Sequence, residues 1–133
     1  MQVRLQGLHM VNKKIICFDF DGVIATYKGW KGFDKFGKPI KKVINVMKKL
    51  KERGYYITIF TTRADTPKLR RWLEKHKVPY DSLNSFAHNP PYTSFKPIYH
   101  CVVDDRAVNP INLSEEELLK EIERTVNLYE KET

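Results

Sequence analysis

The sequence contains little cysteine and no long apolar run, and both absences narrow what the protein can be. Only two of its 133 residues are cysteine, Cys17 and Cys101, and each lies within an apolar stretch. Two thiols are too few for a disulfide-stapled fold or a cysteine-rich metal site, so we expect two buried thiols in a reducing, cytoplasmic setting. No apolar run approaches the length that spans a bilayer. Residues 1–12 lack a signal-peptide core, so we expect a cytoplasmic protein without a membrane partner.

Length and composition indicate one globular domain. A chain of 133 residues can bury one modest core but is too short for two ordinary domains. Its 41% hydrophobic and 30% charged residues are typical of a folded chain. Residues 1–12 have little pattern of their own, and we interpret them as an N-terminal extension. Residues 13–133 are predicted to form a single domain without internal repeats.

Positive charge dominates the chain but is spread unevenly. The formal net charge is +8. The last twenty residues hold seven acids and three bases, so the remaining 113 residues carry 21 bases and nine acids, a net charge of +12. Such a surface attracts phosphates, nucleotides or nucleic acid. The same lysines are also compatible with a solvated surface that has no partner.

Apolar strands alternate with amphipathic helices along the chain. The patterns predict four strands, which lie at residues 15–18, 55–60, within 78–86, and at 99–103. They predict three helices, which start at Pro39, at the Thr66–Pro67 cap, and at the Ser114–Glu117 capping box. Alternation of this kind implies an α/β fold, with a parallel sheet and helices on both faces.

The segment 23–38 follows the first strand and reads as a loop. Three glycines within nine residues argue against a helix, and the position just past the strand is suited to covering a site. Its exposed rings, Trp30 and Phe33, either stack on a ring of a ligand or pack against the domain.

Polar side chains follow three of the predicted strands, at the point where each strand ends. They are Asp19 and Asp21, then Thr61 and Thr62, then Asp104 and Asp105, with Lys96 just before the last strand. In a parallel sheet these strand ends share one edge, so the side chains should converge. Converging carboxylates repel unless a cation lies among them, and oxygen ligands without histidine or cysteine favour Mg²⁺. Taken singly, each pair also fits a structural turn or a helix cap.

Together, these residues resemble the four motifs of the haloacid dehalogenase (HAD) superfamily of phosphatases. The matching positions, in motif order, are Asp19-Phe20-Asp21-Gly22, Thr61, Lys96 and Asp104-Asp105. Val23 stands where the commonest form of the first motif has threonine. The resemblance implies a three-layer, Rossmann-like (HAD-like) sheet. The short segments 23–38 and 64–95 resemble those of small members without a cap domain.

The resemblance also implies a role for each site residue. Asp19 would be the nucleophile, and Asp21 would be the acid that protonates the leaving group and then activates water. Mg²⁺ would be held by Asp19, the backbone carbonyl of Asp21, and Asp104. Phosphate would be bound by Thr61, Thr62 and Lys96, with Gly22, Asp105, Arg63 and Arg106 in support. The two arginines either contact other groups of the substrate or form surface ion pairs.

The predicted function is therefore Mg²⁺-dependent hydrolysis of a phosphate monoester through an aspartyl-phosphate. One alternative is a phosphatase that acts on nucleotide or polynucleotide ends, which accounts for the basic surface as well. Another is a nucleic-acid-binding module without catalysis, which no base-reading motif supports. The expected partner is a small or nucleotide-like phosphorylated substrate, with nucleic acid possible, and the oligomeric state stays open.

Overall fold

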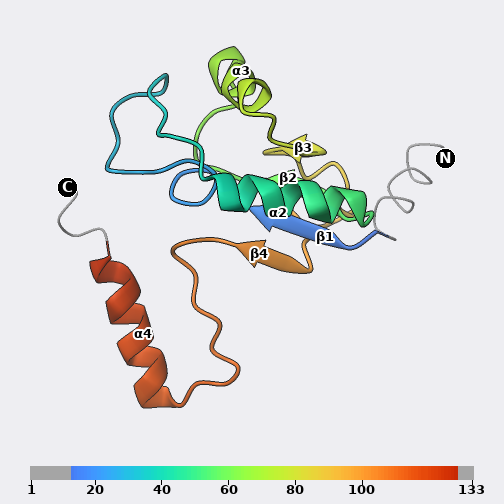
Figure 1. Ribbon diagram of the computed structural model, residues 1–133. Coiled ribbons are helices and arrows are strands. Elements are labelled where there is room, and N and C mark those ends of the chain that lie inside the picture. Colours follow the sequence, from blue (N-terminus) through green and yellow to red (C-terminus); the bar gives the residue numbers. More distant parts are fainter. Residues whose placement is uncertain (1–12, 129–133) are drawn as a thin grey trace.

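The computed structural model describes residues 13–128, which form a small α/β fold around four parallel strands (Figure 1). In sequence order the strands are β1 (Ile15–Phe18), β2 (Tyr56–Ile59), β3 (Ser82–Leu83) and β4 (Cys101–Val103). Their order in the sheet is β3-β2-β1-β4, and every pairing is parallel. The predicted fold class is thereby confirmed. The predicted extension, residues 1–12, lies outside the described residues.

The hydrophobic core lies on one face of this sheet. Side chains alternate across a strand, so Ile16 and Phe18 of β1 share a face with Ile57 and Ile59 of β2. Two helices cover that face, α2 (Lys41–Glu52) and α3 (Pro67–Lys75), and they bury Ile44, Met47, Leu69 and Leu73 against it. Right-handed crossovers from β1 to β2 and from β2 to β3 place both helices on the same side.

On the opposite face of β2, where the sequence predicts a second layer of helix, the irregular segment 84–98 contributes His88. His88 is buried there and packs on Tyr56, with 5.3 Å between the ring centroids. Its Nε2 lies 3.1 Å from the carbonyl oxygen of Ile98. The irregular segment is thus held by a buried side chain rather than by helical packing.

The start of α2 differs from the prediction by two residues. Pro39 pairs with Ala25 in an isolated bridge, and the N–H of Ile40 donates to the carbonyl of Ile24 at 2.8 Å. Because these bonds close the loop first, the helix begins only at Lys41. The start of α3 agrees with the prediction, since the Thr66 hydroxyl accepts from the N–H of Leu69.

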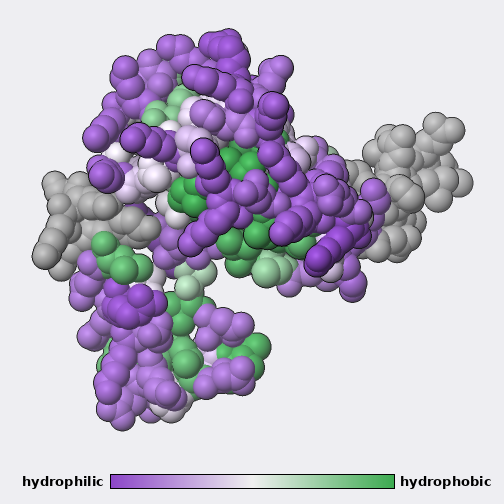
Figure 2. Space-filling model, viewed as in Figure 1, coloured by the Kyte–Doolittle hydropathy of each residue, from purple (hydrophilic) through white to green (hydrophobic). Residues whose placement is uncertain are grey.

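The last helix, α4 (Glu115–Asn127), stands away from the sheet (Figure 1). Its predicted capping box is present, but its apolar side chains Leu119, Ile122 and Val126 are exposed. Figure 2 shows hydrophobic patches on the surface of this part of the molecule. Because α4 does not cover β4, Cys101 is exposed, which corrects the prediction of two buried thiols. No helix within residues 13–128 is long and apolar enough to cross a membrane.

Candidate active site

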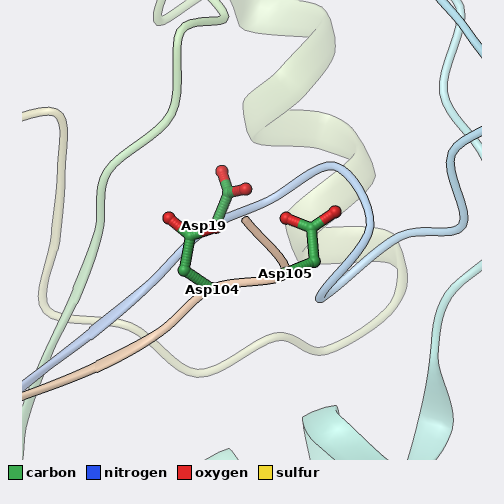
Figure 3. Close-up of side chains that lie close together, drawn as sticks. All are labelled: Asp19, Asp104 and Asp105. Carbon is green, nitrogen blue, oxygen red and sulfur yellow. The ribbon is translucent and has the colours of Figure 1, made fainter. Parts of the chain in front are cut away.

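Three carboxylates meet where β1 and β4 end (Figure 3). Asp19 follows β1, whereas Asp104 and Asp105 follow β4, and one oxygen of each lies within 4.8 Å of the others. The N–H of Asp19 donates to the carbonyl oxygen of Val103 at 3.0 Å, which ties the two strand ends together. In Figure 3 the three side chains rise on the same side of the ribbon. The parallel pairing of β1 and β4 therefore produces the convergence that the sequence predicts.

The electrostatics of this cluster favour a cation. Burial raises the pKa of Asp19 to about 7, against an N–H of Phe20 that donates to its Oδ1 and lowers the pKa. The charges of Asp104 and Asp105 and a hydrogen bond with Asp105 raise it further. A bound cation would remove this repulsion, and three carboxylates offer only the hard oxygen donors that Mg²⁺ prefers. The donor set thus fits the metal that the sequence predicts.

A tight turn follows Asp19 and sets the direction of Asp21. Gly22 has φ +82°, a left-handed conformation that glycine adopts without strain. Its N–H donates to the carbonyl of Ala25 at 2.7 Å, and the N–H groups of Ile24 and Ala25 donate to the carbonyl of Phe20. These bonds fold residues 20–25 back on themselves immediately after β1.

Asp21 is held by a buried arginine and takes no part in the carboxylate cluster. The Nε of Arg63 donates to Asp21 Oδ2 at 2.8 Å, while Asp21 Oδ1 is buried without a hydrogen-bond partner among the described residues. The Arg63 side chain is only 5% exposed. Its guanidinium lies 4.8 Å from the ring centroids of both Trp30 and Phe36. Arg63 is therefore an internal link and not a surface ion pair. Its contact with a substrate stays a prediction.

The same guanidinium fastens the loop that precedes α2. It donates to the carbonyl oxygens of Phe33 at 3.3 Å and Lys35 at 2.8 Å. Trp30 packs on Arg63 with part of its ring, and both Trp30 and Phe33 stay exposed, by 59% and 60%. One buried side chain thus joins the loop to the carboxylate that follows β1.

A side-chain clamp shapes the turn after β2. The N–H of Thr61 donates to Asn84 Oδ1 at 2.8 Å, and Asn84 Nδ2 donates to the carbonyl of Arg63 at 2.8 Å. The N–H of Arg63 also donates to the Thr61 hydroxyl oxygen at 3.2 Å. Asn84 has φ +51°, which asparagine tolerates better than most residues. Asn84 is not among the residues that the sequence predicts for the site, and its position just past the β3 segment was the available signal.

These elements surround a cavity of about 510 Å³ at the carboxyl edge of the sheet. It is lined by six predicted site residues, Asp19, Asp21, Thr61, Thr62, Asp104 and Arg106, together with the rings of Tyr27, Trp30 and Phe60. We call it the carboxylate cavity. It holds acidic, hydroxyl and guanidinium groups within reach of one small ligand.

Lys96 does not line the carboxylate cavity, and neither do the predicted supporting residues Gly22, Arg63 and Asp105. Lys96 is exposed, and its Nζ lies 5.4 Å from the ring centroid of Tyr99. Its carbonyl oxygen accepts from Asn89 Nδ2 at 2.7 Å, which fixes the backbone of a proline-punctuated segment. The sequence places Lys96 close to β4 but does not specify the path of that segment.

Known proteins share the fold of this chain. No protein-family model and no curated protein matches the sequence. A conserved protein from Bacteroides thetaiotaomicron has a similar structure, with a TM-score of 0.58, 18% identity, and coverage of 90% of this chain and 96% of that one. A chain of the Pnkp1/Rnl/Hen1 RNA repair complex gives a TM-score of 0.51 at 21% identity, over 83% of this chain and 40% of its own.

Proposed function

We propose that the protein is a Mg²⁺-dependent phosphatase of the HAD type, which hydrolyses a phosphate monoester through an aspartyl-phosphate. The observation that supports this most is the meeting of Asp19, Asp104 and Asp105 at the edge of a cavity that Asp21 also lines. A lone nucleophile would not need two further carboxylates beside it. A nucleophile that binds the same cation as its substrate needs further carboxylates to hold that cation.

Two carboxylates divide the proposed chemistry between them. The Asp19 carboxylate attacks phosphorus, and the bond from phosphorus to the leaving oxygen breaks as Asp21 gives that oxygen a proton. In the second step Asp21 takes a proton from water, the water oxygen bonds to phosphorus, and Asp19 is released. Arg63 holds Asp21 through Oδ2, so the buried Oδ1 would be the atom that carries the proton.

The remaining groups would hold the ion and the phosphoryl oxygens. Asp19, Asp104 and Asp105 would bind Mg²⁺, whose charge would offset the repulsion between carboxylate and phosphate. The hydroxyls of Thr61 and Thr62 line the same cavity and would bind the transferred group. Lys96 would join them by swinging its flexible side chain away from Tyr99, a movement of a long stem with low barriers.

Turnover of para-nitrophenyl phosphate tests this proposal directly. The wild-type protein should release phosphate in Mg²⁺ and lose the activity in a chelator. Asp19→Asn should abolish the activity without unfolding the protein. Asp34→Asn is a matched control, because Asp34 pairs with Lys68 on the surface, away from the carboxylate cavity. Undiminished turnover by Asp19→Asn would refute the assignment.

A phosphorylated polynucleotide end is the second candidate substrate. The net charge of +12 over residues 1–113 favours a polyanion, and the fold is shared with a chain of an RNA repair complex. A nucleic-acid-binding module without catalysis predicts something different: binding that weakens steeply with salt and survives Asp19→Asn, with no release of phosphate. Comparing phosphate release from terminally phosphorylated oligonucleotides and from para-nitrophenyl phosphate separates these functions.

A further inference from the structure

A second pocket, of about 420 Å³, lies inside the loop 26–38 and adjoins the carboxylate cavity. Its wall carries five basic side chains, those of Arg63 and of four lysines, Lys28, Lys31, Lys35 and Lys38. We call it the lysine pocket. Asp21 and Tyr27 line both the lysine pocket and the carboxylate cavity, so the two hollows are adjacent. In Figure 2 the lobe formed by this loop and α3 is mostly hydrophilic.

The four lysines of the lysine pocket are not neutralised by close ion pairs among residues 13–128. None of its four lysines forms an ion pair with a carboxylate among residues 13–128. The only acid in its wall is Asp21, and that carboxylate is already paired with Arg63 at 2.8 Å. Lysines scattered over a convex surface need no partner, but four of them around one hollow favour an anionic ligand with several oxygens.

The loop that presents these lysines is fixed by its own hydrogen bonds. Its two ends are joined, because the N–H of Thr26 donates to the carbonyl of Lys38 at 2.8 Å and the N–H of Lys38 donates to Thr26 Oγ1 at 2.9 Å. Its middle is fastened by Arg63, which donates to the carbonyl of Lys35 at 2.8 Å. A preformed backbone lowers the entropy lost when a ligand binds.

We propose that the lysine pocket binds the phosphodiester next to the terminal phosphate of a nucleic-acid strand, an inference that rests on the proposed phosphatase function. The group next to a terminal phosphate held at Asp19 would lie close to the lysine pocket, because Asp21 and Tyr27 line both hollows. The rings of Trp30 and Phe33, 59% and 60% exposed, offer a stacking surface for bases beside it. A substrate with a single phosphate leaves the lysine pocket empty.

A charge-deletion cycle tests this inference. The protein variants are wild type, Lys31→Ala/Lys35→Ala, and the matched control Lys48→Ala/Lys49→Ala, which removes the same charge from exposed positions on α2. The substrates are a terminally phosphorylated oligonucleotide, the same strand with a neutral methylphosphonate at the linkage next to the terminal phosphate, and para-nitrophenyl phosphate. The quantity measured is kcat/KM for each combination of protein variant and substrate.

The neutral linkage should lower kcat/KM of the wild type and of the control at least about tenfold, as expected for a lost charge-assisted contact. For Lys31→Ala/Lys35→Ala, kcat/KM should be the same on the strand with the neutral linkage and on the charged strand. On the charged strand, the ratio of its kcat/KM to that for para-nitrophenyl phosphate should be lower than the wild-type ratio by the same factor. An equal effect of the neutral linkage on all three proteins overturns the inference. The inference is also overturned if a nucleoside diphosphate binds more tightly than the oligonucleotide and loses its binding to the same extent in Lys31→Ala/Lys35→Ala.

Failure of the proposed phosphatase function gives a different result. If the wild type hydrolyses none of these substrates, the phosphatase assignment is wrong, and fluorescence anisotropy of the labelled strands replaces kcat/KM. The lysine pocket is then supported if Lys31→Ala/Lys35→Ala weakens binding of the charged strand about tenfold while the control does not. It is rejected if both double variants bind alike.

Discussion

Arg63 Nε donates to Asp21 Oδ2 at 2.8 Å, and the two residues form a partly buried ion pair across 42 positions of the sequence. A guanidinium removed from water is stable only when its donors are used. Here they are used by Asp21 and by the carbonyl oxygens of the loop, including that of Lys35. The orientation of Asp21 and the shape of the loop are therefore coupled through one side chain.

Replacing Arg63 with lysine should disturb both features at once. Lysine keeps the charge but cannot reach a carboxylate and the loop carbonyls together, because it lacks the forked guanidinium. Buried acceptors left without donors should lower the free energy of unfolding by about 1–3 kcal/mol. A misplaced Asp21 should lower kcat for para-nitrophenyl phosphate more than it changes KM. Denaturant unfolding and steady-state kinetics measure the two effects.

Arg71→Lys is the control for this substitution, since Arg71 is an exposed residue of α3. It should shift the free energy of unfolding by no more than about 0.5 kcal/mol. Equal stability of the two variants would mean that the buried pair does not hold the loop.

The stability of the metal-free protein should fall as pH rises from about 4 to about 7. The pKa of Asp19 is raised from 3.8 to about 7, chiefly by burial and by the neighbouring charges of Asp104 and Asp105. Between these two values the folded state holds a proton that the unfolded state has released, so raising the pH favours unfolding. Above about pH 7 this group adds no further change. Thermal melts in a chelator over this pH range check the slope.

Mg²⁺ should reverse that trend. The ion competes with protons for Asp19, so the rise in Tm on adding Mg²⁺ should be larger at pH 8 than at pH 5. Asp19→Asn should flatten the pH dependence in a chelator and reduce the Mg²⁺ effect. A rise in Tm that is the same at both pH values would show that the added ion does not bind at Asp19.

The sequence predicts the parts of this molecule that depend on local pattern. The apolar run Ile15–Phe18 becomes an inner strand of the sheet, and the Ser114 capping box forms as expected, because both depend on neighbouring residues. The burial of Arg63 was not predictable in this way, since it requires the loop to close around a distant side chain. Lys96 shows the same limit. The sequence fixes how many residues separate it from β4, but the direction of its side chain depends on the path of residues 84–98.

Asn84→Ala should loosen the turn that presents Thr61. It removes the side-chain bonds to the N–H of Thr61 and the carbonyl of Arg63, and it places alanine at φ +51°. The lost bonds and the strained backbone together should lower the free energy of unfolding by about 2–3 kcal/mol. KM for para-nitrophenyl phosphate should rise as well. Asn84→Gly separates backbone strain from the lost hydrogen bonds, since glycine tolerates this φ but makes no side-chain bonds. If Asn84→Gly is as stable as the wild type, the side-chain bonds of Asn84 do not stabilise the turn.

Gly37→Ala should open the loop that forms the lysine pocket. A Cβ at Gly37 would lie 1.8 Å from the carbonyl oxygen of Thr26, so the paired ends of the loop would have to separate. Relief of such a clash typically costs about 1–3 kcal/mol, and the lysines would lose their fixed spacing. We expect a lower Tm and, for a terminally phosphorylated oligonucleotide, a KM that rises more than KM for para-nitrophenyl phosphate.

Gly54→Ala is the control for the Gly37 substitution. A Cβ at Gly54 meets nothing within 4 Å, but the residue has φ +88°, so alanine there is penalised by backbone strain alone, by about 1–2 kcal/mol. Both variants should therefore lower Tm, whereas only Gly37→Ala should change the ratio of the two KM values, because Gly54 lies at the far end of α2. If the ratio moves equally in both, the loss of oligonucleotide binding follows from general destabilisation, and closure of the loop at Thr26 does not set the spacing of the lysines.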